Sequence, residues 1–185
     1  MSSIVFTTPA SDDDLQQVLD VQERNQPHNI TPEQLAKEGF VTVRHNLDLL
    51  RSMNESAPQV IAKDGGKVVG YALVMLQSFQ DLVPVLKPMF VTLESLSYRN
   101  RPMQSYNYYV MGQVCVAEGY RGKGVFDGMY QKHKALYANQ FDMCITEIAS
   151  RNPRSLRAHQ RVGFQTIHTF TDATDTWDIV AWDWK

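Results

Sequence analysis

Short stretches rich in apolar residues recur along the chain at strand length, and one of them, 143–149, alternates with the period of two that is typical of half-buried strands. The clearest pair, residues 59–63 and 67–76, flanks Asp64-Gly65-Gly66, a sequence that favours the turn of a β-hairpin. Strands are therefore expected along the whole chain. The same pattern predicts them at 3–8, 106–116, 143–149, 164–170 and 177–184.

Helical spacing separates these strands. An apolar stripe with a period near 3.6 runs through residues 124–138, and acidic residues suit the first turn of a helix over 11–22. Strands that alternate with helices in this order predict an α/β sheet with helices on both faces, in one domain over residues 1–185. Shorter helices are predicted at 31–39, 42–52 and 153–162.

A basic, glycine-rich turn joins the strand at 106–116 to the helix at 124–138. It reads Arg121-Gly122-Lys123-Gly124 and leads directly into Val125. A helix N-terminus presents unpaired N–H groups and a partial positive charge, which suit a phosphate. Glycine lets the backbone approach an anion without a Cβ in the way. The turn therefore predicts a phosphorylated cofactor, with an ordinary glycine-rich turn as the alternative.

Two common phosphate motifs do not fit this turn. The dinucleotide fingerprint would need a third glycine at position 127, which is Asp127. The P-loop would need a lysine and a hydroxyl residue directly after its second glycine, where Val125 and Phe126 stand. The pattern that remains is Arg121-x-x-Gly124 between a strand and a helix.

A second segment carries aligned polar residues on a helix. Asn152 is a good N-cap and Pro153 a good first helical residue, while Gly163 suits the end of the helix. Asn152, Ser155 and His159 are spaced i, i+3 and i+7, so they share one helix face. Polar groups in that arrangement favour a polar ligand over simple packing.

Together the two segments resemble the GCN5-related N-acetyltransferase family, whose patterns are Gln/Arg-x-x-Gly-x-Gly/Ala and Asn-x-x-Ser/Ala-x-x-x-Tyr/His-x-x-x-Gly-Phe. The resemblance covers roughly residues 60–76 and 106–184. The chain departs from the first family pattern at its last position, where Phe126 replaces the usual small residue. The resemblance implies a mixed, mostly antiparallel central sheet flanked by helices, and direct transfer of an acetyl group from acetyl-CoA to a primary amine.

The resemblance also assigns the residues that bind acetyl-CoA. It implies that the backbone of the strand at 106–116 bonds the pantetheine arm, at Val114 and Val116. The helix at 153–162 would contact the pantetheine from the other side, through Asn152 and Ser155, although both could serve only as helix caps. The pyrophosphate would lie on the turn, at Arg121, Gly122, Lys123, Gly124, Val125 and Phe126.

Two residues are candidates for proton transfer. His159 stands where many relatives carry a tyrosine that protonates the departing thiolate, and the free pKa of histidine, about 6.5, suits that task. The alternative is a histidine that only hydrogen-bonds within the fold. Glu147 lies five residues before Asn152, at the offset of a base in protein N-terminal acetyltransferases of the family; the alternative is a structural carboxylate. Glu94 is a weaker candidate.

Composition narrows the partners. The chain has 185 residues with a formal net charge of −2 and no long basic run, so it does not suggest binding to nucleic acid or to a membrane. The five histidines show no metal-ligand spacing. Two cysteines, Cys115 and Cys144, fall in predicted strands and favour a reducing cytoplasm over a disulfide framework. The N-terminal residues do not resemble a signal peptide.

Some alternatives stay open. Residues 77–105 contain three prolines and form a connection of unusual length. In the family such inserts shape the acceptor pocket; the other interpretation is a short helix at 85–96 that covers the sheet. The rival to an enzyme is a non-catalytic acyl-CoA-binding module with the same fold. The resemblance implies a small-molecule or peptide amine as the acceptor; relatives are often dimers, so a homodimer is one possible state.

Overall fold

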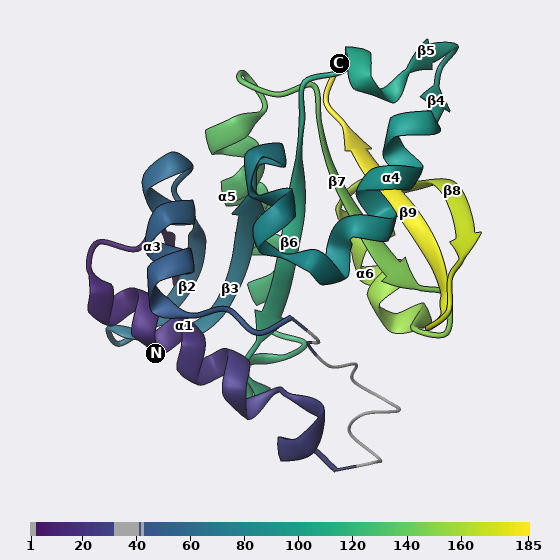
Figure 1. Ribbon diagram of the computed structural model, residues 1–185. Helices are drawn as coiled ribbons and strands as arrows, with labels where there is room; N and C mark the ends of the chain where they lie inside the picture. Colours follow the sequence, from purple (N-terminus) through teal and green to yellow (C-terminus); the bar gives the residue numbers. More distant parts are fainter. Residues whose placement is uncertain (1–2, 32–40, 42) are drawn as a thin grey trace. The chain divides into compact units, whose positions relative to one another are not determined.

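The computed structural model describes residues 3–31, 41 and 43–185. Its main sheet has seven strands in the order β1-β2-β3-β6-β7-β9-β8 (Figure 1). Four of its pairings, β1–β2, β2–β3, β7–β9 and β8–β9, are antiparallel, whereas β6 and β7 run parallel. The strands are β1 (Val5–Thr7), β2 (Val60–Asp64), β3 (Lys67–Met75), β6 (Tyr108–Val116), β7 (Met143–Ala149), β8 (Gln165–Thr171) and β9 (Thr176–Asp183).

Helices and 3₁₀ turns connect these strands, so the mixed, mostly antiparallel α/β class expected from the sequence is confirmed. A small second sheet pairs β4 (Ser97–Tyr98) with β5 (Arg101–Pro102). The helices are α1 (Asp12–Arg24), α3 (Leu47–Ser56), α4 (Lys87–Ser95), α5 (Val125–Tyr137) and α6 (Pro153–Val162). The 3₁₀ turns are η1 (Pro27–Asn29), η2 (Gln77–Leu82), η3 (Pro84–Leu86), η4 (Met103–Ser105) and η5 (Glu118–Tyr120).

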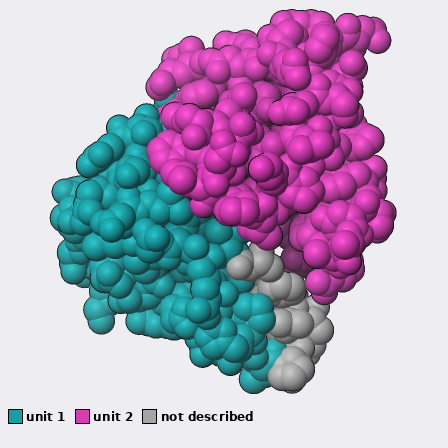
Figure 2. Space-filling view, in the orientation of Figure 1, with its two compact units in different colours: residues 1–74, 111–136 teal, residues 75–110, 137–185 magenta. Residues whose placement is uncertain are grey.

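The chain divides into two compact units, coloured separately in Figure 2. Unit 1 comprises Met1–Val74 and Met111–Leu136, and unit 2 comprises Met75–Val110 and Tyr137–Lys185. Strand β6 contributes residues to both units. Each unit is described by itself below.

In unit 1, helices cover both faces of the strands. Figure 1 shows α1 and α3 in front of β2 and β3, with α5 behind β3 and β6. Helix α1 begins as the sequence predicts, because the Ser11 hydroxyl accepts a hydrogen bond from the Asp14 N–H and three aspartates occupy the first turn. Its apolar face is buried through Leu15, Val18 and Val21.

The helix expected at 42–52 is wrong in its position. The observed α3 starts later, because the Asn46 side chain caps the N–H of Leu49 at 2.8 Å. The backbone just before it is held elsewhere: the N–H of His45 donates to Gln22 Oε1 at 2.9 Å. This bond ties the segment before α3 to α1, and the side chain of Asn46 then caps the helix that follows. The helix expected at 31–39 lies largely outside the described residues.

Unit 2 has its own buried side chains. Phe164 lies between His159 and Trp182, with ring centroids 5.1 and 5.6 Å from theirs. The region 77–105 contains α4 (Lys87–Ser95), so a short helix lies within 85–96, as one of the two interpretations of this segment had it. The turn between β4 and β5 has positive φ at Arg99 and Asn100, and the Arg99 guanidinium bonds the Asp183 carboxylate at 2.8 Å.

Gly128 tests the packing of unit 1. A Cβ added at this position of α5 would overlap the ring of Phe6 on β1. We expect Gly128→Ala to lower the free energy of unfolding by about 1–3 kcal/mol, as overpacking of a core does. The measurement is urea denaturation of the purified variant. Gly119→Ala is the matched control, since a Cβ there meets nothing within 4 Å, and equal stability of both variants would contradict the packing argument.

Candidate active site

The glycine-rich turn after β6 is built from backbone geometry that few residues adopt. Strand β6 ends at Val116, and the N–H of Ala117 donates to the Val69 carbonyl at 2.9 Å. Gly122 and Gly124 have φ values of +72° and +77°, in the left-handed region that favours glycine. The first bond of α5 follows at once, from the N–H of Gly128 to the Gly124 carbonyl at 2.9 Å.

This turn fits a phosphate group. A Cβ added at Gly122 or Gly124 would meet nothing within 4 Å, so the space beside both glycines is open. Helix α5 is 13 residues long and begins directly after Gly124. The first turn of a helix carries N–H groups without an intrahelical acceptor, next to the positive end of the helix dipole. The backbone therefore forms a cradle of the kind that binds pyrophosphate.

The unusual Phe126 leaves this cradle intact. Its ring packs against Tyr130, one turn further along α5, with ring centroids 4.7 Å apart. A side chain directed along its own helix does not change which backbone groups the first turn presents.

The side chains of the turn engage protein groups. Arg121 Nε donates to the Val116 carbonyl at 3.1 Å, and Arg121 Nη2 donates to Asn25 Oδ1 at 2.6 Å. The Lys123 ammonium lies 5.4 Å from the centre of the Tyr120 ring. Val114 and Val116 are half-buried and alternate along β6 with the buried Gln113 and Cys115, so the two valines share one face.

A cavity of about 310 Å³ adjoins the turn within unit 1. It lies between the C-terminal end of α1 with η1 and the segment that follows β6. Two cationic residues, Arg24 and Arg121, and the carboxylate residue Glu118 contribute to its walls. The other lining residues are Val21, Asn25, Asn29, Ile30, Ala117, Gly119 and Tyr120.

A buried polar network lies deeper in unit 1, and the sequence did not point to it. Gln113 Oε1 accepts hydrogen bonds from Gln22 Nε2 and from the Tyr71 hydroxyl, both at 2.7 Å. Gln113 Nε2 donates to the Val43 carbonyl at 3.0 Å, and Gln22 Nε2 also lies 2.8 Å from His45 Nδ1. The one available signal was a glutamine within an apolar strand. Burial lowers the pKa of His45 to about 4, so its ring is neutral.

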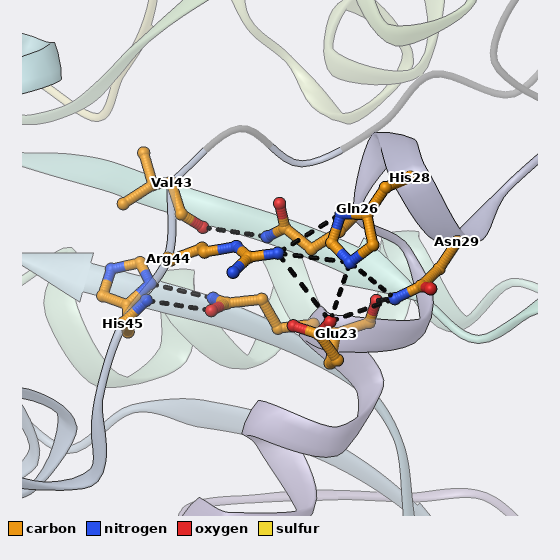
Figure 3. Close-up of polar contacts among 8 residues, drawn as sticks. Glu23, Gln26, His28, Asn29, Val43, Arg44 and His45 are labelled. Atoms are coloured by element: carbon orange, nitrogen blue, oxygen red, sulfur yellow. Dashed lines mark hydrogen bonds and ion pairs between the residues drawn. The ribbon is translucent and has the colours of Figure 1, made fainter.

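A more exposed set of contacts surrounds the end of α1 (Figure 3). Glu23 Oε1 accepts from His28 Nε2 and Asn29 Nδ2, both at 3.0 Å, and lies 3.8 Å from the Arg44 guanidinium. Gln26 Nε2 donates to the Val43 carbonyl at 3.4 Å. These contacts hold residues 43–45 beside the end of α1, within unit 1.

The remaining candidate residues all belong to unit 2. Glu147 lies on β7 opposite Ile179 and is half-buried. Within the described part of the chain, its carboxyl has no hydrogen bond or ion pair. Burial raises the pKa of Glu147 to about 7, and the negative charge of Asp172 acts in the same direction. The contribution of Asp172 could not be predicted from the sequence, because the pairing of β8 with β9 brings it near.

Helix α6 carries the second motif as the sequence predicts. Asn152 Oδ1 caps the helix by accepting from the Ser155 N–H at 3.1 Å, and Gly163 ends it with φ +121°. His159 is 2% exposed, and its Nδ1 lies 2.8 Å from the Ser155 carbonyl and 3.4 Å from the Ser155 hydroxyl. A carbonyl only accepts, so Nδ1 carries the proton in the neutral ring. Burial lowers the pKa of His159 to about 4.

The two cysteines have the properties of packed residues. Both Cys115 and Cys144 are free and buried, and burial raises the pKa of Cys115 to about 12. A thiol with so high a pKa is a poor nucleophile near neutral pH.

In the described residues, no helix is long and apolar enough to cross a membrane, and no cluster of metal-ligating side chains is found.

Comparison with known proteins gives this geometry a family. The model of the acetyltransferase (GNAT) family matches residues 17–164, so the chain belongs to that family. An N-acetyltransferase from Staphylococcus aureus Mu50 is similar in structure, with a TM-score of 0.64, 17% identity and complete coverage of both chains. No curated protein sequence matches the chain significantly.

Two further solved structures are similar at low identity. A putative acetyltransferase from Salmonella typhimurium, solved with its cofactor acetyl-CoA, has a TM-score of 0.64 and 13% identity, over 98% of this chain and 94% of that one. The ribosomal-protein-S18-alanine N-acetyltransferase from Escherichia coli has a TM-score of 0.62 and 10% identity, with the same coverage. At such identities these likenesses establish the shared fold.

Gly124 tests the cradle directly. Proline fixes φ near −65°, which is incompatible with the φ of +77° at this position. It also removes the backbone N–H of residue 124. We expect Gly124→Pro to weaken acetyl-CoA binding at least tenfold, measured by isothermal titration calorimetry. Gly124→Asn is the matched control, because asparagine tolerates the left-handed region and should retain more affinity. Unchanged affinity in a folded proline variant would contradict the assignment of this turn.

Proposed function

We propose that this protein is an N-acetyltransferase that moves an acetyl group from acetyl-CoA directly to a primary amine. The acceptor is a small-molecule amine or a peptide N-terminus. Membership of the acetyltransferase family supports the class of reaction. The observation that carries the proposal is the half-buried carboxyl of Glu147, which has a pKa of about 7 and no bonding partner among the described residues.

The chemistry of the reaction explains why such a carboxyl is useful. A primary amine is protonated near neutral pH and must lose a proton before it can attack. A general base works best when its pKa lies close to the operating pH, and Glu147 meets that condition. An ordinary glutamate, with a pKa near 4.3, would be a much weaker base.

The bonds and protons balance in one transfer step. The amine nitrogen forms a bond to the thioester carbonyl carbon, and the bond from that carbon to sulfur breaks. Glu147 takes the proton released by the amine, directly or through water. The departing sulfur becomes a thiolate, and since thiols have pKa values near 8.5, solvent can protonate it.

Acetyl-CoA is the co-substrate, and the proposal assigns its parts to the residues that the motifs indicated. The pyrophosphate is assigned to the turn from Arg121 to Phe126, whose open space and left-handed glycines support it. The pantetheine arm is assigned to the backbone at Val114 and Val116 and to Asn152 and Ser155. Residues 1–185 are treated as one acetyltransferase domain, since the family model extends through both units.

For His159 we propose the structural role. Its proton lies on Nδ1 and faces the Ser155 carbonyl, so a neutral ring has no proton on Nε2 to give to a thiolate. With a pKa of about 4, the ring is uncharged throughout the range in which the enzyme would operate. These features favour a buried histidine that holds the first turns of α6 together.

The rival is a non-catalytic acyl-CoA-binding module. One assay separates it from the enzyme: release of free thiol from acetyl-CoA in the presence of a panel of amines, which should include a peptide with an N-terminal alanine. That peptide is chosen because one structural neighbour is named for acetylating a protein alanine. Sustained thiol release with any acceptor supports the enzyme, whereas acetyl-CoA binding without release supports the module.

Glu147→Gln tests the base. We expect kcat/KM to fall by about 10²–10⁴ near pH 7 and to recover partly as the pH approaches the acceptor pKa, where free amine is supplied by the solution. The check is a pH–rate profile from pH 6 to 10. A constant ratio of variant to wild-type rate across that range would remove Glu147 from the mechanism.

The same variant has a distinctive effect on stability. The folded pKa of Glu147, about 7, lies above the unfolded value near 4.5, so its stabilising contribution is present below pH 4.5 and is lost as the pH rises through 7. Glutamine does not titrate, and the variant should therefore gain stability relative to the wild type as the pH rises, by about 3 kcal/mol at pH 8 and by less than about 1 kcal/mol at pH 5. A salt-bridged structural glutamate would show the opposite sign.

His159→Asn tests the structural role, because an asparagine amide can replace Nδ1–H as the donor to the Ser155 carbonyl. We expect kcat to stay within a few-fold of wild type and the alkaline side of the pH–rate profile to be unchanged. The free energy of unfolding should fall by about 1–3 kcal/mol because the side chain is smaller. Kinetics and thermal melting of this variant, beside His159→Ala, provide the check. A loss of kcat by about 10² or more in both variants would restore the acid role.

A further inference from the structure

The side chain of Arg121 joins three segments of unit 1. Its Nε donates to the carbonyl of Val116, at the end of β6, and its Nη2 donates to Oδ1 of Asn25, directly after α1. Arg121 itself is the first residue of the proposed pyrophosphate turn. Two bonds from one planar group fix the orientation of the guanidinium, and with it the start of the turn.

The Asn25 side chain is itself held in one orientation. Its Nδ2 donates to the Val21 carbonyl at 2.8 Å, so the amide must present its oxygen to Arg121. Its backbone N–H bonds the Gln22 carbonyl at 3.0 Å, and its carbonyl accepts from the Val41 N–H at 3.4 Å. Asn25 is only 7% exposed. These hydrogen bonds therefore hold the side-chain oxygen of Asn25 in the position at which it accepts from the Arg121 guanidinium.

Asparagine is the residue that satisfies both neighbours. Aspartate would accept from Arg121 but could not donate to the Val21 carbonyl, and its charge would lie at the negative end of the α1 dipole. Alanine would leave the guanidinium without its partner of 2.6 Å. The two substitutions thus separate the bond to Arg121 from the bond to the helix.

The pair is accessible to a ligand. Asn25 and Arg121 both line the cavity of about 310 Å³ beside the turn. A guanidinium in a cavity wall is not enclosed by the core, and its position affects what can bind next to it. A long side chain that is ordered before binding loses less conformational entropy when the ligand arrives.

We propose that Asn25 is a positioning residue for acetyl-CoA: through the guanidinium of Arg121 it holds the 121–124 turn against the end of β6, in the conformation that takes the pyrophosphate. The inference rests on the function proposed above. It predicts that the contribution of Asn25 is felt only by a donor that carries the pyrophosphate.

The experiment compares two acetyl donors. Acetyl-CoA carries the pyrophosphate, and acetyl-pantetheine lacks it. We expect Asn25→Ala to raise KM for acetyl-CoA about tenfold with kcat unchanged, as the loss of one hydrogen bond to a charged group implies. With acetyl-pantetheine the variant should equal the wild type. Asn25→Asp, which keeps an oxygen for Arg121, should stay close to the wild-type KM for acetyl-CoA.

Two controls make the result specific. Asn29→Ala alters another asparagine of the same cavity, whose side-chain amide contacts Glu23 and His28, and it should leave both donors unaffected. In a double-mutant cycle, adding Asn25→Ala to Arg121→Ala should cause no further loss, since the two residues act through one bond. Melting curves of every variant establish that the compared proteins are folded.

The contrary outcomes are distinct. If Asn25→Ala raises KM equally for both donors, or if Asn25→Asp is as impaired as Asn25→Ala, Asn25 is only the cap of α1 and the inference fails. If the wild type releases no thiol from acetyl-CoA with any amine, the proposed function fails instead. If Asn25→Ala has the wild-type KM for acetyl-CoA, the function stands and the positioning role does not.

Discussion

The packing of unit 1 depends on the hydrogen bonds made by the buried side-chain amide of Gln113. Polar groups inside a core are costly unless they are fully bonded, and Gln113 bonds three separate segments: α1 through Gln22, β3 through Tyr71, and the extended segment before α3 through Val43. Because Gln113 lies on β6, these segments are arranged around the strand that leads into the 121–124 turn. Replacing it with an apolar residue would leave several buried partners unsatisfied at once.

The same principle acts in reverse at Glu147. Its carboxyl is half-buried and has no partner among the described residues, so the charged form is disfavoured and the pKa rises to about 7. Such a group does not stabilise the fold above that pH. A carboxyl group whose pKa lies near neutrality is typical of a site at which it accepts or donates a proton during catalysis. Removing its charge is therefore expected to raise the stability of the fold and to lower the activity.

His159 illustrates how local surroundings can redirect a motif. The sequence aligned it with a family acid, and its spacing with Asn152 and Ser155 was correct. The position of the proton was not available from spacing. It follows from the 2.8 Å contact between Nδ1 and the Ser155 carbonyl, one turn earlier in the same helix, and from burial of the ring against Phe164. The helix face was predictable, whereas the chemistry on that face was not.

The sequence by itself determined the seven strands of the main sheet, most helices and both motifs, because periodicity, caps and glycines act over a few residues; the short pair β4 and β5 was not predicted. The N-cap at Asn152 and the turn at Gly124 are examples. Tertiary structure decided what depends on distant neighbours. The segment before α3 is held by the bond between His45 and Gln22, and the guanidinium of Arg121 is held by Asn25, 96 positions away in the chain. Local sequence patterns do not predict such partners, because burial and long-range hydrogen bonds form only in the folded chain.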